Sequence, residues 1–410
     1  MKNIKYLAWF FSDESMNKLL TSNGFLIKKL SENFEKLYFV NMIKLKLDTY
    51  HPFHKEEFNF EIDKNFELPS NIIIFIPKTR KDFNNFMIGK ELIAINNIGR
   101  RFSDLKIHFF LAKYRIKQVQ ISDKGLVNSG QIIQKNLFWK NLSQRLKRRG
   151  SHKLIVLLSN LGLVPKVQIR FISMPEIIET INKSFIKKIF YNLKLFYAKE
   201  FVLINSSIYD IFKKAKFEIK EDQIVLLDTF FLNPDIIASG SNPDKENIEK
   251  HYYFLNKLIN NLSTMYKKKI VVCIHPKDDL ELKKKYFPNL DVVQYKTRKN
   301  IYKAFLVLFI ETSSIVDAIL LKKRILTLFS NFFSKTINNF GQSFASRAGL
   351  LQINIENELK TDKKMFLSKL DEAKDNYTNY VKSYIAPDGN NIGYEKIIKI
   401  LKERFFKTVN

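Results

Sequence analysis

Short runs of apolar, β-prone residues recur along the sequence, and segments with helical spacing of apolar residues stand between them. Strands are expected at 6–11, 37–42, 71–76 and 119–122, and again at 201–205, 223–227, 270–274, 291–294, 305–310 and 324–328. Strands that alternate with helices pair in parallel, because each helix carries the chain back to the start of the next strand. The sequence therefore predicts an α/β fold built on parallel sheets.

Some segments between these runs have patterns of their own. Phe86 to Phe102 has helical spacing, whereas Lys106 to Leu111 is typical of a strand. From Gln134 to Lys153 the pattern loosens and becomes basic. A second basic and aromatic stretch, Lys183 to Lys199, is either an amphipathic helix on an anionic membrane surface or, as we favour, a surface helix packed on the core. Beyond Asp362 the sequence predicts helices.

The chain has 410 residues, which exceeds the size of a typical single core, so two domains are expected. The repeated β–α series is typical of a doubly wound domain. We place an N-terminal Rossmann-like domain at residues 1–200 and a C-terminal one at 201–375. Residues 376–410 are expected to form helices that could pack back on the N-terminal domain.

The chain is strongly basic, with 69 Lys and Arg against 41 Asp and Glu and a net charge of +28. Such a field attracts nucleic acid, anionic lipid or phosphorylated substrates. The chain is also rich in Lys, Asn, Ile and Phe and has only 12 Gly, as an AT-rich genome would encode. Codon bias therefore explains part of the charge, but not all of it.

Three features of the sequence bear on the compartment. The apolar run at residues 6–11 is too short for a signal peptide, and no stretch of about 20 apolar residues could span a membrane. The single cysteine, Cys273, lies in an expected buried strand, so it is a core thiol and no disulfide framework can form within the chain. We expect a cytoplasmic protein that could bind peripherally to the inner face of the membrane.

Polar residues follow two of the expected strands in the second half. The strand 270–274 is followed by His275-Pro276-Lys277, and the strand 305–310 by Glu311-Thr312-Ser313-Ser314. Ligands of open α/β sheets bind just outside the carboxyl ends of the strands. Taken separately, a surface histidine and hydroxyls that cap a helix are ordinary features. Together, an imidazole and two hydroxyls at one edge could hold a phosphate, with help from the helix that follows.

Asp123-Lys124-Gly125 follows a strand of the first half. A carboxylate in that position could act as a general base toward a sugar hydroxyl, although a turn aspartate beside glycine is the common alternative and the one that these residues alone favour. No G-x-G-x-x-G motif, phosphate-binding P-loop or D-x-D triplet occurs, and the six histidines and one cysteine have no zinc spacing. We therefore expect a nucleotide held by side chains, with no metal and no cofactor.

The second half resembles bacterial surface-carbohydrate glycosyltransferases, including the sialyltransferases and polysialyltransferases of capsule and lipooligosaccharide synthesis. The residues that carry this resemblance are His275-Pro276, Ser313-Ser314, and the segment around Asp228, Pro234-Asp235 and Tyr252-Tyr253. The resemblance implies a B-type glycosyltransferase fold, in which two Rossmann-like domains face a central cleft. It also implies that the histidine and the serines contact the phosphate and ribose of a CMP-activated donor.

The same resemblance bears on catalysis. The family's catalytic motif has two acidic residues and then glycine in the first domain, and Asp123 is the nearest match, with Lys124 in the second acidic position. We therefore expect an inverting, metal-independent glycosyltransferase that moves a sialic acid or a related ulosonic acid from a CMP-sugar to an oligosaccharide or glycolipid of the bacterial surface. Asp123 and His275 would be its catalytic residues. The first domain would bind the acceptor and the second the donor.

Two alternatives remain open from the sequence. A polyol-phosphate transferase of the teichoic-acid type also uses a B-type fold with histidine and serine near the nucleotide, but it takes a CDP donor. A nucleic-acid-binding protein would explain the charge and the many aromatic residues, and it requires a continuous basic groove with exposed aromatic side chains. The main interpretation has no nucleic-acid partner.

Overall fold

The computed structural model describes most of the chain in eleven stretches: residues 6–12, 16–45, 68–100, 102–122, 142–175, 198–215, 219–228, 244–275, 278–333, 335–357 and 362–406, with single positions between 178 and 196. The chain forms two compact units. The first holds most residues up to 210 together with those from 386 onward, and the second holds residues 211–385. The domain bounds expected from the sequence, at residues 200 and 376, stay predictions.

The first unit is built on a sheet of seven described strands in the order β3-β2-β1-β4-β5-β6-β7, all paired in parallel. The strands are β1 (Tyr6–Phe11), β2 (Leu37–Asn41), β3 (Ile72–Phe75), β4 (Leu92–Asn97), β5 (Lys117–Ser122), β6 (Val167–Ile172) and β7 (Ala198–Leu203). The chain starts in the middle at β1, moves outward to β3, and then returns to β4 and moves outward the other way. This is the doubly wound order, with its switch point between β1 and β4.

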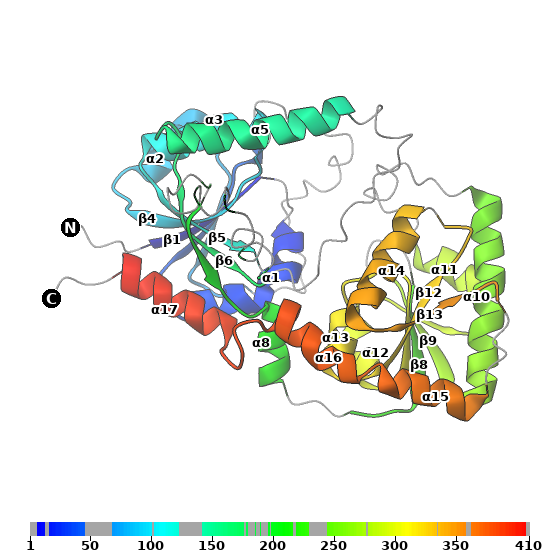
Figure 1. Ribbon diagram of the computed structural model, residues 1–410. Coiled ribbons are helices and arrows are strands. Elements are labelled where there is room, and N and C mark those ends of the chain that lie inside the picture. Colours follow the sequence, from blue (N-terminus) through cyan, green and yellow to red (C-terminus); the bar gives the residue numbers. More distant parts are fainter. Residues whose placement is uncertain are drawn as a thin grey trace. The chain divides into compact units, whose positions relative to one another are not determined.

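Helices cover both faces of this sheet (Figure 1). The described helices of the unit are α1 (Met16–Ser31), η1 (Ile43–Leu45), α2 (Arg80–Met87), η2 (Phe102–Asp104), α3 (Leu105–Lys113), α5 (Leu142–Asn160), α8 (Ser207–Lys214) and α17 (Gly393–Phe405). Trp9 packs with α1 and α17 on one face, while the next residue, Phe10, packs with α2 and α3 on the other. Successive side chains of a strand point to opposite faces, so β1 supplies both cores.

The last helix joins the first unit through buried polar contacts. The carboxylate of Asp210 accepts hydrogen bonds from the Gly393 N–H at 2.8 Å and from the Tyr394 N–H at 2.9 Å, which satisfies free donors at the start of α17. The side-chain amide of Asn205 donates to the carbonyls of Gly389 and Asn391. The end of the chain is thereby fixed beside residues that precede it by about 180 positions.

The second unit repeats the same topology with six described strands in the order β10-β9-β8-β11-β12-β13, again all parallel. The strands are β8 (Gln223–Leu227), β9 (Lys269–Cys273), β10 (Asp291–Val293), β11 (Ala304–Phe309), β12 (Arg324–Phe329) and β13 (Leu351–Asn354). The helices are α10 (Lys245–Tyr266), α11 (Leu280–Tyr286), α12 (Thr297–Tyr302), α13 (Ile315–Leu320), α14 (Lys335–Ala348), α15 (Lys363–Glu372), α16 (Asp375–Tyr380) and η3 (Val381–Ile385). The switch point of this sheet lies between β8 and β11.

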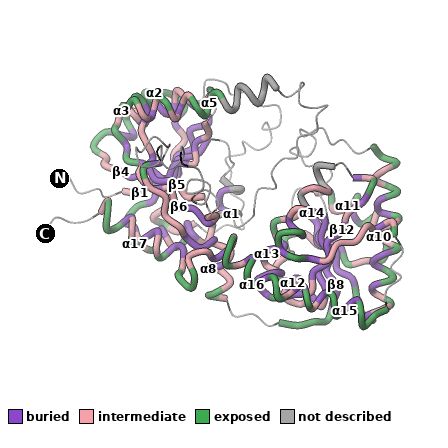
Figure 2. Tube along the Cα trace, viewed as in Figure 1, coloured by how far each residue is buried: buried purple, intermediate pink, exposed green. Residues whose placement is uncertain are grey.

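The buried residues of each unit concentrate on its sheet (Figure 2). The strands β8 and β11 are almost entirely buried, which explains their continuous apolar sequences. The predicted α/β fold with two Rossmann-like doubly wound units is therefore confirmed. The predicted cleft between the units stays a prediction. In the described part of the chain, no helix is both long enough and apolar enough to cross a membrane.

Two local predictions in the first unit are wrong. The predicted helix at Phe86 to Phe102 contains the strand β4, and the predicted strand at Lys106 to Leu111 is the helix α3. Strand β4 lies between β1 and β5 with both faces covered, so its apolar residues do not alternate with polar ones. Periodicity alone cannot separate such a strand from a buried helix. In α3, apolar side chains stand on several sides of the helix and imitate a buried strand.

Candidate functional site

The sequence-predicted residues of the second half follow strands at the centre of the second sheet. Strand β9 leads into His275, β8 leads into Asp228, and β11 leads into Glu311–Ser314. The three strands are neighbours in the order β9-β8-β11 and run in parallel, so these residues lie at one edge of the sheet. With neighbouring strands about 4.8 Å apart, the axes of β9 and β11 are about 10 Å apart. This edge, at the switch point, is where doubly wound sheets bind ligands.

His275 occupies an exposed position at the end of β9. The Ile274 N–H still donates to the Val293 carbonyl of β10 at 3.1 Å, so the strand ends just before the histidine. The Asp278 N–H then donates to the His275 carbonyl at 2.9 Å and closes a turn. Pro276 and Lys277, two further predicted site residues, lie outside the described residues. The backbone of His275 is thus fixed on both sides while its position stays open to solvent.

The hydroxyl groups of the turn after β11 do not cap the following helix, as they would in the ordinary interpretation of the sequence. The hydroxyl of Thr312 accepts a hydrogen bond from the Ser314 N–H at 3.3 Å. Ser314 precedes the helix α13 and makes no side-chain capping bond. Ser313 is exposed, and its hydroxyl makes no hydrogen bond within the described part of the chain. Glu311 and Thr312 are half-buried. The Thr312 side chain thus stabilises the backbone of the turn, and the Ser313 hydroxyl stays accessible to a ligand.

Helix α14 supports this turn from behind. Its residue Gly341 is buried, and a Cβ atom built there would lie 2.3 Å from the carbonyl oxygen of Ile310, directly before Glu311. Only glycine permits such a close approach of a helix to the end of a strand. The position of the strand end therefore depends on the absence of a side chain at Gly341.

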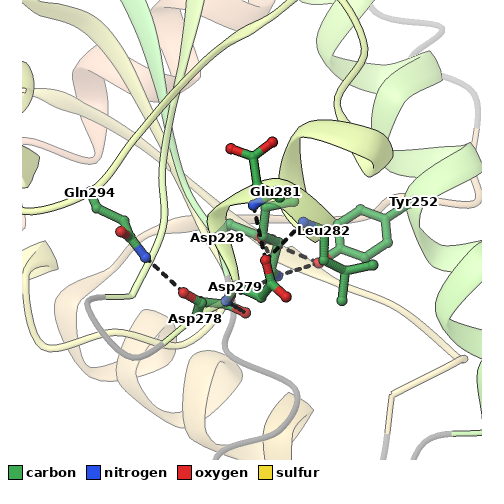
Figure 3. Close-up of polar contacts among 8 residues, drawn as sticks. Asp228, Tyr252, Asp278, Asp279, Glu281, Leu282 and Gln294 are labelled. Atoms are coloured by element: carbon green, nitrogen blue, oxygen red, sulfur yellow. Dashed lines mark hydrogen bonds and ion pairs between the residues drawn. The ribbon is translucent and has the colours of Figure 1, made fainter.

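A buried cluster of charged and polar side chains lies at the same edge of the sheet (Figure 3). The Lys283 side chain is only 3% exposed, and its Nζ lies 2.5 Å from Asp228 Oδ2 and 3.1 Å from Asp278 Oδ2. The Tyr252 hydroxyl donates to the same oxygen of Asp228 at 3.1 Å and also contacts Lys283 Nζ. Asp228 follows β8, Tyr252 belongs to α10, Lys283 to α11, and Asp278 ends the His275 turn. Lys283 therefore links the turn that carries His275 to the end of strand β8 through two ion pairs.

Burial determines the protonation of this cluster. Desolvation raises the pKa of Asp278, against the opposing effect of the Lys283 ammonium. Desolvation, followed by the charges of Asp228 and Asp278, holds the pKa of the Tyr252 hydroxyl well above its usual range. The tyrosine therefore stays neutral and acts as a donor. A buried ammonium between two carboxylates satisfies the rule that buried charges are paired.

Two more contacts hold the segment between β9 and α11. The side-chain amide of Gln294 donates to the Asp278 carbonyl at 2.7 Å. The carboxylate of Asp279 accepts from the Glu281 N–H at 2.9 Å and from the Leu282 N–H at 3.0 Å, which caps the start of α11. Figure 3 shows these bonds around the cluster. The turn that carries His275 is therefore anchored at its far end by both side-chain and backbone contacts.

Reasoning from the sequence missed the role of Lys283. It stands in the run Lys283-Lys284-Lys285 of an amphipathic helix, where lysines normally face water. Asp228 and Tyr252 entered only through the family resemblance. The spacing of residues in α11 was the signal that could have shown the burial of Lys283. Lys283 lies four residues before the buried Phe287 and four after Asp279, so it stands on the same side of the helix as Phe287.

The candidate base of the first half cannot be placed in the same way. Asp123, Lys124 and Gly125 lie outside the described residues. The described part of β5 ends at Ser122, and β5 lies between β4 and β6 in the first sheet. The assignment of Asp123 as the base stays a prediction.

The single cysteine of the chain is not suited to nucleophilic chemistry. Cys273 is 3% exposed at the end of β9, and desolvation raises the pKa of its thiol to about 12. It is therefore a protonated core thiol and a poor nucleophile. Among the described residues, no three His, Cys, Asp or Glu side chains are grouped so that they could hold a metal ion.

Comparison with known proteins identifies the fold. No family model matches the sequence, and no curated protein matches it. Among solved structures, a candidate UDP-N-acetylglucosamine 2-epimerase from Listeria monocytogenes is similar over 100% of this chain and 98% of its own, with 13% identity and a TM-score of 0.51. A calicheamicin glycosyltransferase covers 100% of both chains at 7% identity and a TM-score of 0.47. The UDP-GlcNAc 2-epimerase of Methanocaldococcus jannaschii covers 97% and 99% at 15% identity and a TM-score of 0.46.

The first of these similarities extends over nearly the whole of both chains, so it concerns both units and their order along the sequence. At 13% identity it establishes the fold alone. The chain therefore shares the fold of that structure, with two Rossmann-like α/β units in one chain.

Proposed function

We propose that the chain is a glycosyltransferase that binds the nucleotide part of an activated sugar at the carboxyl edge of the second sheet. One observation carries the proposal: the exposed His275 and Ser313 follow strands on either side of β8, beside the switch point of a doubly wound sheet. The name of the Listeria monocytogenes protein, which refers to a nucleotide sugar, fits a site of this kind.

The donor that we propose is a CMP-activated sialic acid or related ulosonic acid. This finer assignment rests on the resemblance of His275-Pro276 and Ser313-Ser314 to the motifs of the bacterial sialyltransferases. The acceptor would be an oligosaccharide or glycolipid of the bacterial surface. Lys277 could add a further positive charge near the phosphate, and Thr312, with the half-buried Glu311 before it, belongs to the turn that presents Ser313.

The proposed reaction breaks the bond between the anomeric carbon and the phosphate oxygen of the donor. The acceptor hydroxyl oxygen attacks that carbon from the opposite face, and its proton passes to the carboxylate of Asp123. CMP leaves as a phosphate monoester whose new negative charge is stabilised by hydrogen bonds from the His275 imidazole and the Ser313 hydroxyl. CMP is already a good leaving group for such sugars, so the step as proposed needs no divalent cation.

Thermal unfolding with nucleotides tests the donor site. We expect CMP to raise the unfolding temperature, because a ligand that binds only the folded state stabilises it by about 2.7 kcal/mol at a hundred times its Kd. His275→Ala and Ser313→Ala should lose most of this stabilisation. Ser368→Ala, which removes an exposed hydroxyl from α15 in the same unit, is the matched control and should keep it.

Other outcomes of the same titration point to other functions. No response to any cytidine nucleotide would refute the proposal. A response to CDP but not to CMP would indicate a polyol-phosphate transferase, and a response to UDP alone would favour a UDP-sugar epimerase, the second candidate that the Listeria monocytogenes similarity suggests. Stabilisation by single-stranded DNA alone would indicate a nucleic-acid-binding protein. Release of CMP from CMP-sialic acid in the presence of acceptor glycans would then establish the transfer.

A further inference from the structure

Helix α3 of the first unit has apolar side chains on two opposite sides. Ile107 and Leu111 are fully buried in the core that α3 shares with α2 and the sheet. Phe109, which points the other way, is 46% exposed, and Leu105, one helical turn before it, is half-buried against a cluster that includes Ile155 of α5. A helix that is apolar on both sides is normally covered on both sides. The outer side of α3 is therefore a candidate contact surface.

The outer side of α3 borders a hollow of about 410 Å³ between α3 and the start of α2. Leu105, Phe109 and Phe110 supply its apolar lining. Its other lining residues are Arg80 from α2 and Lys106 and Lys113 from α3. We call these six residues the α2–α3 surface. Among the described residues, no acidic side chain lines the hollow, so these six residues combine apolar area with positive charge only.

The three cations of this surface are not neutralised by carboxylates in the part of the chain that the structure describes. Arg80 and Lys106 lie over the Phe110 ring, 5.6 and 6.0 Å from its centroid, and Lys113 lies 5.2 Å from the Tyr114 centroid. Two acidic residues lie within two positions of these cations in the sequence. Asp104, two residues before Lys106, is fully buried. Asp82, two residues after Arg80, accepts from the backbone N–H groups of Lys78 and Thr79 in a capping box, and these bonds lower its pKa. The Asp82 carboxylate thus stabilises the N–H groups at the start of α2 and forms no ion pair with the three cations in the described part of the chain.

Other exposed apolar side chains belong to the same elements. Ile88, at the end of α2, is 72% exposed, and Phe102, in η2 directly before α3, is 45% exposed. Figure 2 shows exposed stretches along both α2 and α3. Exposed apolar residues that gather on adjoining elements commonly mark a contact site, whereas single ones need no explanation.

We propose that the α2–α3 surface binds the surface of an anionic lipid bilayer. Phe109 would insert at the level of the headgroups, as aromatic side chains do at membrane interfaces, while Arg80, Lys106 and Lys113 pair with lipid phosphates. The apolar stems of the two lysines add to the contact. This combination of inserted apolar residues and flanking cations is how interfacial helices bind membranes.

A bilayer fits this surface better than a nucleic acid does. Single-stranded nucleic acid requires a series of exposed aromatic rings on which bases stack, along a basic groove. Here the exposed Ile88 and the half-buried Leu105 are aliphatic, and aliphatic side chains contribute to insertion among acyl chains but not to base stacking. The inference does not depend on the proposed donor site, because the surface lies in the first unit.

Co-sedimentation of the full chain with lipid vesicles tests this inference. The vesicles would contain phosphatidylcholine alone or phosphatidylcholine with phosphatidylglycerol. The variant Arg80→Gln/Lys106→Gln/Lys113→Gln removes the three cations. Because the whole chain carries +28, the control must lose the same charge elsewhere. Lys245→Gln/Lys284→Gln/Lys299→Gln, three exposed lysines of the second unit, is that control.

We expect the wild-type chain to sediment with the anionic vesicles and not with phosphatidylcholine alone. Each cation in contact with the surface contributes roughly a fivefold factor in partitioning, so the α2–α3 variant should bind on the order of a hundredfold more weakly. The control variant should lose far less. Equal losses in the two triple variants would overturn the inference, because they would show that binding follows net charge alone.

A second pair of variants tests the apolar part. Phe109→Ser should abolish the binding that persists at raised salt, where charge attraction is screened. Tyr253→Ser, which removes a 67% exposed aromatic side chain from the second unit, should leave that binding unchanged. Both positions are exposed, so folding is expected to survive, as thermal unfolding would verify. Unchanged vesicle binding by Phe109→Ser at raised salt would overturn the inference. It would also be overturned if the wild-type chain bound single-stranded DNA and not vesicles, and if the α2–α3 variants lost that DNA binding.

Discussion

Gly341 offers the sharpest test of how the second unit positions its strand end. A Cβ atom at this position would lie 2.3 Å from the carbonyl oxygen of Ile310 and 3.7 Å from the Thr327 methyl group. Side-chain Cβ atoms do not approach other atoms more closely than 3.0 Å, so an alanine requires a displacement of at least 3.0 − 2.3 = 0.7 Å. The obstacle is the backbone directly after β11, which cannot rotate away as a side chain could.

The expected free-energy change combines two opposing effects. Replacing glycine by alanine inside a helix favours folding by up to about 1 kcal/mol. Overpacking against a rigid neighbour costs about 1–3 kcal/mol, and a displacement of backbone belongs at the upper end of that range. Gly341→Ala should therefore lower the free energy of unfolding by about 2 kcal/mol. The shift of Ile310 should also displace the Glu311–Ser314 turn and weaken stabilisation by CMP.

Equilibrium urea denaturation would measure this change, with Gly24→Ala as the control. Gly24 lies inside α1, and its added Cβ would meet nothing within 4 Å, so that variant should gain up to about 1 kcal/mol. A Gly341→Ala protein that is as stable as the wild type, beside a Gly24→Ala protein that shows its gain, would refute the close packing of α14 on β11.

The other predictions concern buried titratable groups. Lys283→Met should cost about 3–5 kcal/mol, because Asp228 and Asp278 stay buried without their cation. Lys323→Met, at the opposite edge of the same sheet, loses one hydrogen bond to a backbone carbonyl and should cost about 1–3 kcal/mol. Hydrogen exchange in the turn after β9 should rise in the first variant only, and an equal rise in both would contradict the proposed anchoring. Desolvation, followed by the Lys283 charge, lowers the pKa of His251 from 6.5 to about 3. His251 is therefore protonated below pH 6.5 in the unfolded chain but only below about pH 3 in the folded chain. The free energy of unfolding should fall by about 1.4 kcal/mol for each pH unit as the pH falls through this range. Burial lowers the pKa of His108 and of His152 as well, so both contribute slope of the same sign. Denaturation of His251→Leu should therefore show a shallower slope, and an unchanged slope in the variant would exclude a contribution from His251.

Much of the second unit follows from local sequence pattern. The strand β8 has the bounds that were predicted, 223–227. The strands before His275 and Ser313 were also predicted nearly to the residue, because short apolar runs between polar segments leave little choice of structure. The positions of the two candidate site residues at strand ends could therefore be read from the sequence.

The first unit was less predictable, for a reason visible in β4 and α3. Both segments are apolar on more than one side, so neither shows the alternation that separates a strand from a helix. Neighbours far away in the sequence determine which structure forms. Strand β4 fills the position between β1 and β5, and α3 covers one face of the same sheet.

The sequence alone thus determined the fold class, the doubly wound series and the strands that end at His275 and Ser313, because these depend on the order of residues within short segments. The tertiary structure decided which strands are neighbours and which charges are buried. It placed Lys283 between Asp228 and Asp278, and it packed Gly341 on the carbonyl of Ile310. These contacts join residues far apart in the chain, and their energy depends on exclusion of water, which no local pattern records.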